Sequence, residues 1–92
     1  MPRDSAAPPI DADRRRRLRW RARRGLLEND LVLQRFFAAH ETTLGEDDVA
    51  GLDALLDLPD NELLELILGR REPEGIAAQE NPRRVLQLLR EA

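Results

Sequence analysis

The strongest constraint on the fold of this chain is the spacing of its apolar residues. From Leu26 onward they recur at intervals of three and four, which places them on one face of a helix. Alternation with a period of two, which marks a half-buried strand, is absent, and the 92 residues include only three Val, three Ile and two Thr. The sequence therefore predicts an all-α protein, a compact and bundle-like domain of about five helices.

Start and stop signals define a short first helix and a longer second one. Asp11 or Asp13 can cap the first helix, and Gly25 interrupts the helical pattern after it. The second helix is expected over residues 26–40 and should supply much of the core. Its expected apolar face comprises Leu27, Leu31, Leu33, Phe36 and Phe37.

Three further helices are expected in the rest of the chain. They begin at Gly45, which precedes three acids suited to the positive end of a helix, at Pro59 as the first helical residue, and at Asn81 as the N-cap. Gly69 ends the fourth helix, and an irregular connection over 70–80 leads to the fifth. The expected buried residues are Val49, Leu52, Leu55 and Leu56, then Leu63, Leu64, Ile67 and Leu68, then Val85, Leu88 and Leu89.

The first twelve residues differ in composition from the rest of the chain. Residues 1–12 contain three prolines and almost no apolar side chain, so we expect a disordered tail that adds nothing to the core. Residues 13–92 are expected to form a single domain. No apolar run approaches the roughly 20 residues that span a bilayer, and the N-terminus lacks the apolar segment of a secretory signal. We therefore expect a soluble, cytoplasmic monomer without membrane insertion.

The side-chain inventory leaves little room for catalysis. The chain has no Cys and no Tyr, its one imidazole is His40, and its aliphatic hydroxyls are Ser5, Thr42 and Thr43. Thiolate nucleophiles, disulfides and Cys-based zinc sites are excluded, and a Ser/His/Asp triad is nearly so. His40 is expected to be an exposed or capping residue at a helix end, because no further metal ligands can be identified. We expect neither an enzyme nor a metal site.

Charge is distributed very unevenly along the chain. Residues 1–24 carry nine Arg and three Asp, residues 25–69 carry one Arg and eleven acids, and the formal net charge is −3. Eight of the arginines lie between Arg14 and Arg24. This run could bind nucleic acid, bind an acidic protein, or lie across the acidic remainder of its own fold. A pI near 5.2 argues against a dedicated nucleic-acid module.

A short motif stands at the junction of the first two expected helices. It reads Arg24-Gly25-x-x-Glu28, followed by Asp30, with Trp20 upstream and the Phe36-Phe37 pair downstream. This arrangement resembles the SdhE family, also called succinate dehydrogenase assembly factor 2 or FAD assembly factor, whose signature is RGxxE. The resemblance runs to about Gly69, and the last helix matches in type only. Other aromatic residues of the family are replaced here, by Glu41 and by leucines such as Leu64 and Leu66.

The resemblance implies a function as well as a five-helix fold. It implies a chaperone that binds the flavoprotein subunit of succinate dehydrogenase, or of a related fumarate reductase, and promotes covalent attachment of FAD to a histidine of that partner. The factor would hold no cofactor stably and would act on the FAD of the partner. The residues implied to bind the partner are Trp20, Arg23, Arg24, Gly25, Glu28 and Asp30.

These residues also have simpler interpretations. Arg24 and Glu28 could form a surface pair worth about 0.3–0.5 kcal/mol, and Gly25 could merely end a helix. Asp30 could be a local helix-start acid, and Trp20 is more often a packing residue than a ligand-stacking one. The alternative function is an Arg-rich helical regulator that binds nucleic acid. It is disfavoured because the basic helix lacks interleaved aromatics and base-reading Asn or Gln.

Overall fold

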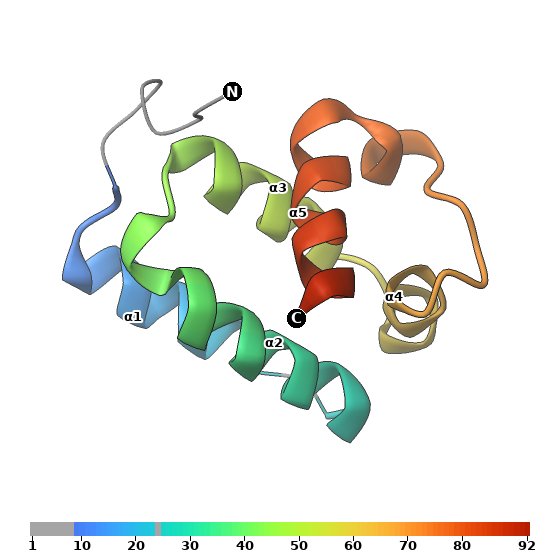
Figure 1. Cartoon of the computed structure of the whole chain (residues 1–92), viewed down its shortest axis with the longest axis horizontal. Coiled ribbons are helices and arrows are strands. Elements are labelled where there is room, and N and C mark those ends of the chain that lie inside the picture. Colours follow the sequence, from blue (N-terminus) through green and yellow to red (C-terminus); the bar gives the residue numbers. More distant parts are fainter. Residues whose placement is uncertain (1–8, 24) are drawn as a thin grey trace.

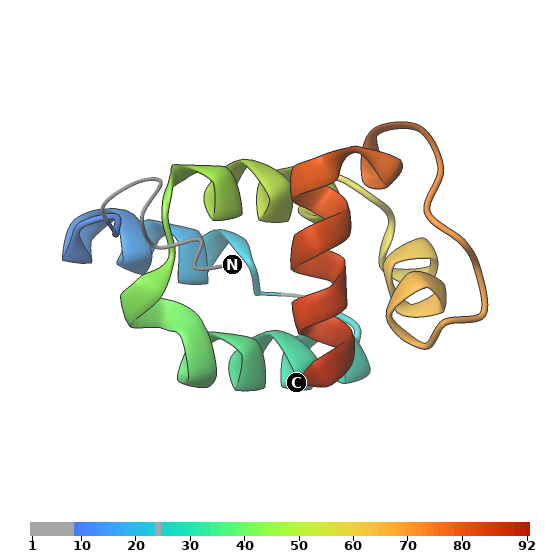
Figure 2. The same cartoon turned by 45° about the horizontal axis from the view of Figure 1, so that its top comes forward.

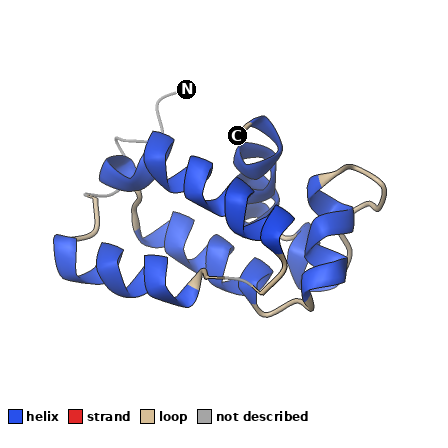
Figure 3. Ribbon diagram, turned by 90° about the horizontal axis from the view of Figure 1, so that it is seen from below, coloured by secondary structure: helices blue, strands red, loops and turns tan. Residues whose placement is uncertain are grey.

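The computed structural model describes residues 9–23 and 25–92 (Figure 1). These residues form five α-helices joined by short connections, and no strand occurs among them (Figure 3). The elements in order are α1 (Ala12–Arg21), α2 (Leu27–His40), η2 (Glu41–Thr43), α3 (Glu46–Leu56), α4 (Asp60–Ile67), η3 (Gly75–Ala78) and α5 (Glu80–Glu91), where η denotes a 3₁₀ turn. The predicted all-α, five-helix fold is confirmed.

Helix α5 organises the packing of the other helices. It contacts α3, α4 and α2, and the contact with α3 is the most extensive (Figure 2). Phe36, Leu55, Leu63 and Val85, one from each of these four helices, are fully buried in one apolar cluster. Helix α1 lies at the opposite end of the molecule from α4 (Figure 1), and it buries Leu18. One face of α1 is therefore left at the surface beside α2.

Helices α3 and α5 approach each other closely at Gly51. A Cβ atom built on this glycine would lie 2.5 Å from the carbonyl oxygen of Asn81 and 2.9 Å from Cγ2 of Val85. The absence of a side chain thus lets the two helices come into near backbone contact. No role for Gly51 could be predicted from the sequence, because a glycine inside a helix does not indicate which other helix packs against it.

The folded part of the chain begins earlier than expected. Ile10 is 5% exposed and belongs to the core, and its N–H donates to the carbonyl oxygen of Leu44 over 2.8 Å. Asp11 caps α1, as one of the two expected alternatives, by accepting a 2.8 Å bond from the N–H of Arg14. The expectation that residues 1–12 add nothing to the core is therefore wrong at Ile10. The rest of the expected tail, residues 1–8, lies outside the described residues.

Replacing Ile10 by Ala is expected to lower the free energy of unfolding by about 2–4 kcal/mol, because most of a buried side chain is lost. Leu27→Ala is the control, since Leu27 is 65% exposed and its truncation should change stability by less than about 0.5 kcal/mol. Urea denaturation followed by circular dichroism measures both values. Equal stabilities of the two variants would show that Ile10 is not docked.

The buried face of α2 differs from the expected one. Leu27 and Leu31 are exposed, whereas Leu33, Phe36 and Phe37 are buried as expected. The buried stripe instead begins at Asn29, whose side chain is completely buried. The reason is that α2 carries two apolar stripes, and only the one that includes Phe36 and Leu33 faces the other helices.

Smaller corrections apply to the last two helices. Helix α4 buries Leu63, Leu66 and Ile67, whereas Leu68 is exposed, and Pro59 is the N-cap of this helix rather than its first residue. Gly69 follows with a φ of 75°, as expected for a stop signal. Helix α5 is capped by Gln79 instead of Asn81 and buries Val85, Leu86 and Leu89. Each change moves a boundary or a stripe by one or two residues, because more than one apolar residue fits the helical spacing.

The N-terminus of α3 is held by a buried carboxylate. Asp48 is 1% exposed, accepts a 2.9 Å hydrogen bond from the N–H of Gly45, and pairs with Arg84 of α5. Gly45 is the N-cap, as expected. The burial of Asp48 was not foreseen, because its place in a run of three acids is typical of an exposed first turn.

Candidate functional site

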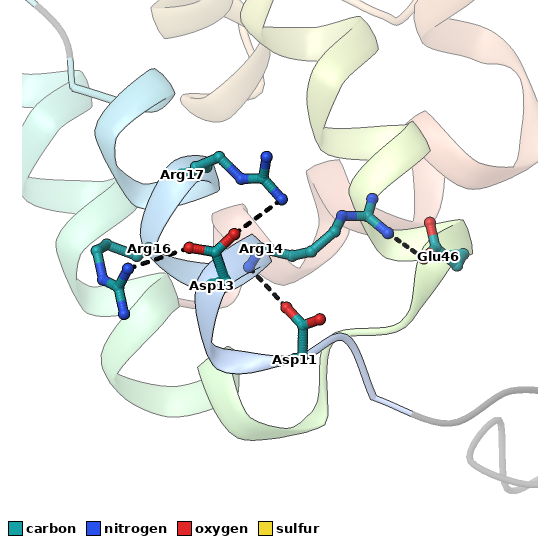
Figure 4. Close-up of polar contacts among 6 residues, drawn as sticks. All are labelled: Asp11, Asp13, Arg14, Arg16, Arg17 and Glu46. Atoms are coloured by element: carbon teal, nitrogen blue, oxygen red, sulfur yellow. Dashed lines mark hydrogen bonds and ion pairs between the residues drawn. The ribbon is translucent and has the colours of Figure 1, made fainter.

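Two arginines of α1 are engaged by acids of α3. Arg14 pairs with Glu46, as Figure 4 shows, and the hydrogen bond and charge of Glu46 raise the pKa of Arg14. Arg21 lies 2.9 Å from Asp53 and 2.8 Å from Asp57, and hydrogen bonds to these carboxylates raise the pKa of Arg21. Both guanidinium groups therefore stay charged at any working pH. The interpretation that the basic helix lies across the acidic part of its own fold is confirmed for these residues.

Other arginines of α1 make local or peripheral pairs. Arg16 and Arg17 share the carboxylate of Asp13, each over 3.1 Å (Figure 4). Arg19 lies 3.1 Å from Glu41, which follows α2. These groups are largely exposed, so each pair contributes at most about 1 kcal/mol to stability. Two guanidinium groups on one carboxylate leave an excess of positive charge on this face of α1.

Trp20 is the most exposed large apolar side chain in the described part of the chain, at 72%. The interpretation of Trp20 as a packing residue is therefore wrong. Helix α1 turns Leu18 inward and Ala22 follows on the same side, so Trp20, two residues from each, points away from the core. The guanidinium carbon of Arg23 lies 5.0 Å from the centre of the Trp20 ring, a cation–π contact.

The turn between α1 and α2 places Gly25 in open space. Gly25 is exposed, and a Cβ atom added to it would meet no atom within 4 Å. Contacts within the described part of the chain therefore leave room for a side chain at position 25. Arg24, the first residue of the motif, lies outside the described residues, and its pairing with Glu28 stays a prediction.

Glu28 and Asp30 stand in the first turn of α2 but point to different sides. They are two residues apart, so the helix turns them in nearly opposite directions. Glu28 is exposed next to the turn. Asp30 is half-buried and accepts a 2.8 Å hydrogen bond from the amide nitrogen of Gln34. The described candidate residues thus form two neighbouring groups. Gly25 and Glu28 lie at the turn, and Trp20, Arg23 and Asp30 lie between α1 and α2.

The turn is anchored on the first residue of α4. The N–H of Leu26 lies 3.4 Å from a carboxylate oxygen of Asp60, and the side-chain amide of Asn29 donates to the Asp60 carbonyl oxygen over 2.9 Å. Neither the burial of Asn29 nor the contact of Asp60 with the turn was predicted from the sequence. The available signal was a polar Asn at a position that the helical spacing places among apolar residues. These bonds fix the position of Gly25 and Glu28 relative to the rest of the fold.

A groove of about 910 Å³ runs between α1 and α2. Trp20, Arg23 and Asp30 border it, whereas Gly25 and Glu28 do not. Its α1 side also carries Arg16 and Arg17, and its α2 side includes Leu33 and Phe37. The groove therefore combines aromatic, cationic and apolar groups, which suits a binding surface more than a site of bond-breaking chemistry.

The described residues contain no cluster of His, Cys, Asp and Glu that could hold a metal ion. The ring of His40 stacks at a tilt on Phe36, with 5.3 Å between ring centres. Residues 9–23 and 25–92 also include no helix with the length and apolarity needed to cross a membrane.

Comparison with known proteins identifies the family. Residues 16–92 match the family Sdh5, described as flavinator of succinate dehydrogenase. A protein of Ralstonia nicotianae named FAD assembly factor SdhE is 58% identical over 80 residues, which cover 87% of this chain and 84% of that protein. Proteins of the same name from Legionella pneumophila (strain Lens) and Coxiella burnetii are 42% and 34% identical. The aligned regions cover 71% and 79% of this chain, and 82% and 89% of those proteins. No solved structure gives a significant match. The resemblance carried by the motif at Gly25 is thus confirmed, and the chain belongs to the Sdh5 family of succinate dehydrogenase flavinators.

Proposed function

We propose that this chain is an FAD assembly factor that binds the flavoprotein subunit of succinate dehydrogenase, or of a related fumarate reductase. In this proposal it promotes covalent attachment of FAD to that subunit. The observation that carries the proposal is the exposed turn with Gly25 and Glu28 in a chain that matches the flavinator family over residues 16–92. The open space around Gly25 would let a partner's backbone approach closely.

The factor acts as a chaperone and supplies no catalytic group. The bond to be formed would join a histidine nitrogen of the partner to its flavin, so both reacting groups belong to the partner. Holding two reacting groups in near-attack geometry can lower a barrier by about 7–11 kcal/mol in favourable cases. A factor that orders the partner around its FAD can therefore speed the reaction by positioning alone. FAD stays with the partner in this scheme, and the factor holds no cofactor of its own.

In this proposal the six candidate residues make different kinds of contact with the partner. Gly25 allows close approach, and the exposed carboxylate of Glu28 can accept hydrogen bonds from the partner. Trp20 and Arg23 offer the residue types that dominate binding energy at protein interfaces. Asp30 borders the same groove as Trp20. The contribution of Arg24 stays a prediction from the motif.

Affinity capture from the native cell tests the identity of the partner. The tagged chain is expected to retain a protein that carries covalent flavin, identified by mass spectrometry, and Glu28→Ala is expected to lose it. Glu72→Ala, which removes an exposed acid from the connection between α4 and η3, is the matched control and should retain the flavoprotein. Capture without any flavoprotein would contradict the proposed function.

Binding of nucleic acid is expected to be weak. Arg14, Arg19 and Arg21 are already paired with acids of the same chain, and the net charge is −3. The remaining arginines should give only non-specific affinity that falls steeply between about 50 and about 200 mM salt. Fluorescence anisotropy with labelled duplex DNA and RNA measures this. Tight, sequence-selective binding at physiological salt would instead favour the nucleic-acid regulator.

A further inference from the structure

The groove between α1 and α2 has an apolar floor that reaches the core. Leu33 and Phe37 line it and are 2% and 5% exposed, and Ala22 contributes a small side chain from the end of α1. The side chain of Trp20 stands at the rim rather than covering the floor, since 72% of its surface is exposed. An apolar side chain placed in the groove would therefore contact Trp20 and Phe37 together.

Two exposed leucines of α2 lie on the side of the helix that borders the groove. Gln34 and Ala38 line the groove, and Leu31 and Leu27 precede Gln34 by three and seven residues, so all four lie along one side of the helix. Leu27 and Leu31 are 65% and 45% exposed. Large apolar side chains gathered at one surface mark a site of protein interaction. This surface extends over several helical turns, which is longer than a small molecule in the groove would need.

The α1 side of the groove is basic. Arg16 and Arg17 share one carboxylate, that of Asp13. Arg23 contacts the Trp20 ring and has no carboxylate within ion-pair distance among the described residues. The arginines on this side of the groove therefore carry positive charge that acids of the described chain do not fully neutralise. A negatively charged ligand would neutralise it.

We propose that this groove seats an acidic segment of the partner flavoprotein, with one apolar side chain between Trp20 and Phe37 and carboxylates against Arg16, Arg17 and Arg23. The inference rests on the proposed function and adds the chemistry of the partner segment. A second copy of this chain is the other occupant that the test distinguishes; three of its acids, Glu46, Asp53 and Asp57, are already paired with arginines of its own α1. A nucleic acid would leave the apolar floor and Leu27 without a partner.

Matched pairs of variants test the groove by titration against the purified flavoprotein subunit. Arg23→Glu reverses an exposed charge at the rim, and Ala38→Trp fills the groove from an exposed position. Each is expected to raise Kd at least about tenfold, because charge reversal and steric blocking act within the contact. Arg83→Glu and Ala50→Trp make the same changes at exposed positions on α5 and α3, and should alter Kd by less than about twofold. Circular dichroism checks that all four variants are folded.

The outcomes separate this inference from the proposed function. If the wild-type chain binds the flavoprotein and the groove variants bind equally well, the groove assignment is wrong while the proposed function stands. If the wild-type chain does not bind the flavoprotein at all, both are wrong. Loss of binding in Arg23→Glu and Ala38→Trp only, with both controls intact, supports the groove.

Photo-crosslinking identifies the occupant. A photoreactive amino acid at position 38 is expected to link to a flavoprotein peptide with at least two carboxylates next to an apolar residue. The same group at position 50 should link to none. A link from position 38 to a second copy of this chain, or to a flavoprotein peptide without acids, would overturn the proposal.

Discussion

Gly25→Arg and Glu28→Ala are each expected to abolish the stimulation of covalent flavinylation while the chain stays folded. The fold tolerates both changes, because a side chain at position 25 would enter open space and Glu28 is exposed. Surface substitutions of this kind change stability by about 0.5 kcal/mol or less. The partner does not tolerate them, since bulk or a lost acceptor at the centre of a contact removes most of its affinity.

A graded series makes this test sharper. Gly25→Ala adds one methyl group and should retain part of the activity, whereas Gly25→Arg should retain none. Glu72→Ala is the control for the loss of an exposed acid and should be fully active. The readout is in-gel flavin fluorescence of the denatured flavoprotein, which detects covalent FAD only, together with circular dichroism of each variant. Normal flavinylation by folded Gly25→Arg and Glu28→Ala would show that this turn is not the working surface.

Gly51→Ala is expected to lower the free energy of unfolding, whereas the same methyl addition at Gly25 should leave it nearly unchanged. The new Cβ would lie 2.5 Å from the carbonyl oxygen of Asn81, so α3 and α5 would have to move apart. These two helices form the most extensive helix–helix contact in the described part of the chain. Overpacking of this kind costs about 1–3 kcal/mol and exceeds the gain of about 1 kcal/mol in helix propensity. We expect a net loss of up to about 2 kcal/mol, which lowers Tm by up to about 8–16 °C in a domain of this size.

Gly25→Ala is the matched control for this prediction, because the same methyl group meets nothing within 4 Å there. Its Tm should lie within a few degrees of that of the wild type. Thermal unfolding followed by circular dichroism compares the two variants. If Gly51→Ala were as stable as Gly25→Ala, the close crossing of α3 and α5 would be wrong.

The helices could be predicted from the sequence better than the faces that they bury. Local signals sufficed at the cap Gly45 and at the stop Gly69, and they narrowed the cap of α1 to Asp11 or Asp13, of which Asp11 is the cap. The buried face of α2 could not be determined in the same way, because the spacing fits both the stripe with Leu31 and the stripe with Phe36. Which stripe is buried depends on where the other helices lie, and this information is not local.

The same limit applies to the candidate site. The motif around Gly25 is contiguous in sequence and could be found there. The exposure of Trp20 could not, because it depends on which face of α1 packs on the other helices, and there Leu18 and Ala22 are buried. The anchoring of the turn by Asp60 is likewise a contact across more than thirty residues. Joint action of the six candidate residues on one partner stays a prediction.

The most direct test of the central claim is reconstitution of flavinylation with purified components. The apo flavoprotein subunit of the same organism is incubated with FAD, with and without this chain, and covalent flavin is measured over time by in-gel fluorescence. We expect the initial rate to rise at least about tenfold with the chain present, equivalent to about 1.4 kcal/mol or more of barrier lowering by positioning. An unchanged rate, with a folded chain and an apo subunit that binds FAD, would contradict the assignment of this protein as an FAD assembly factor.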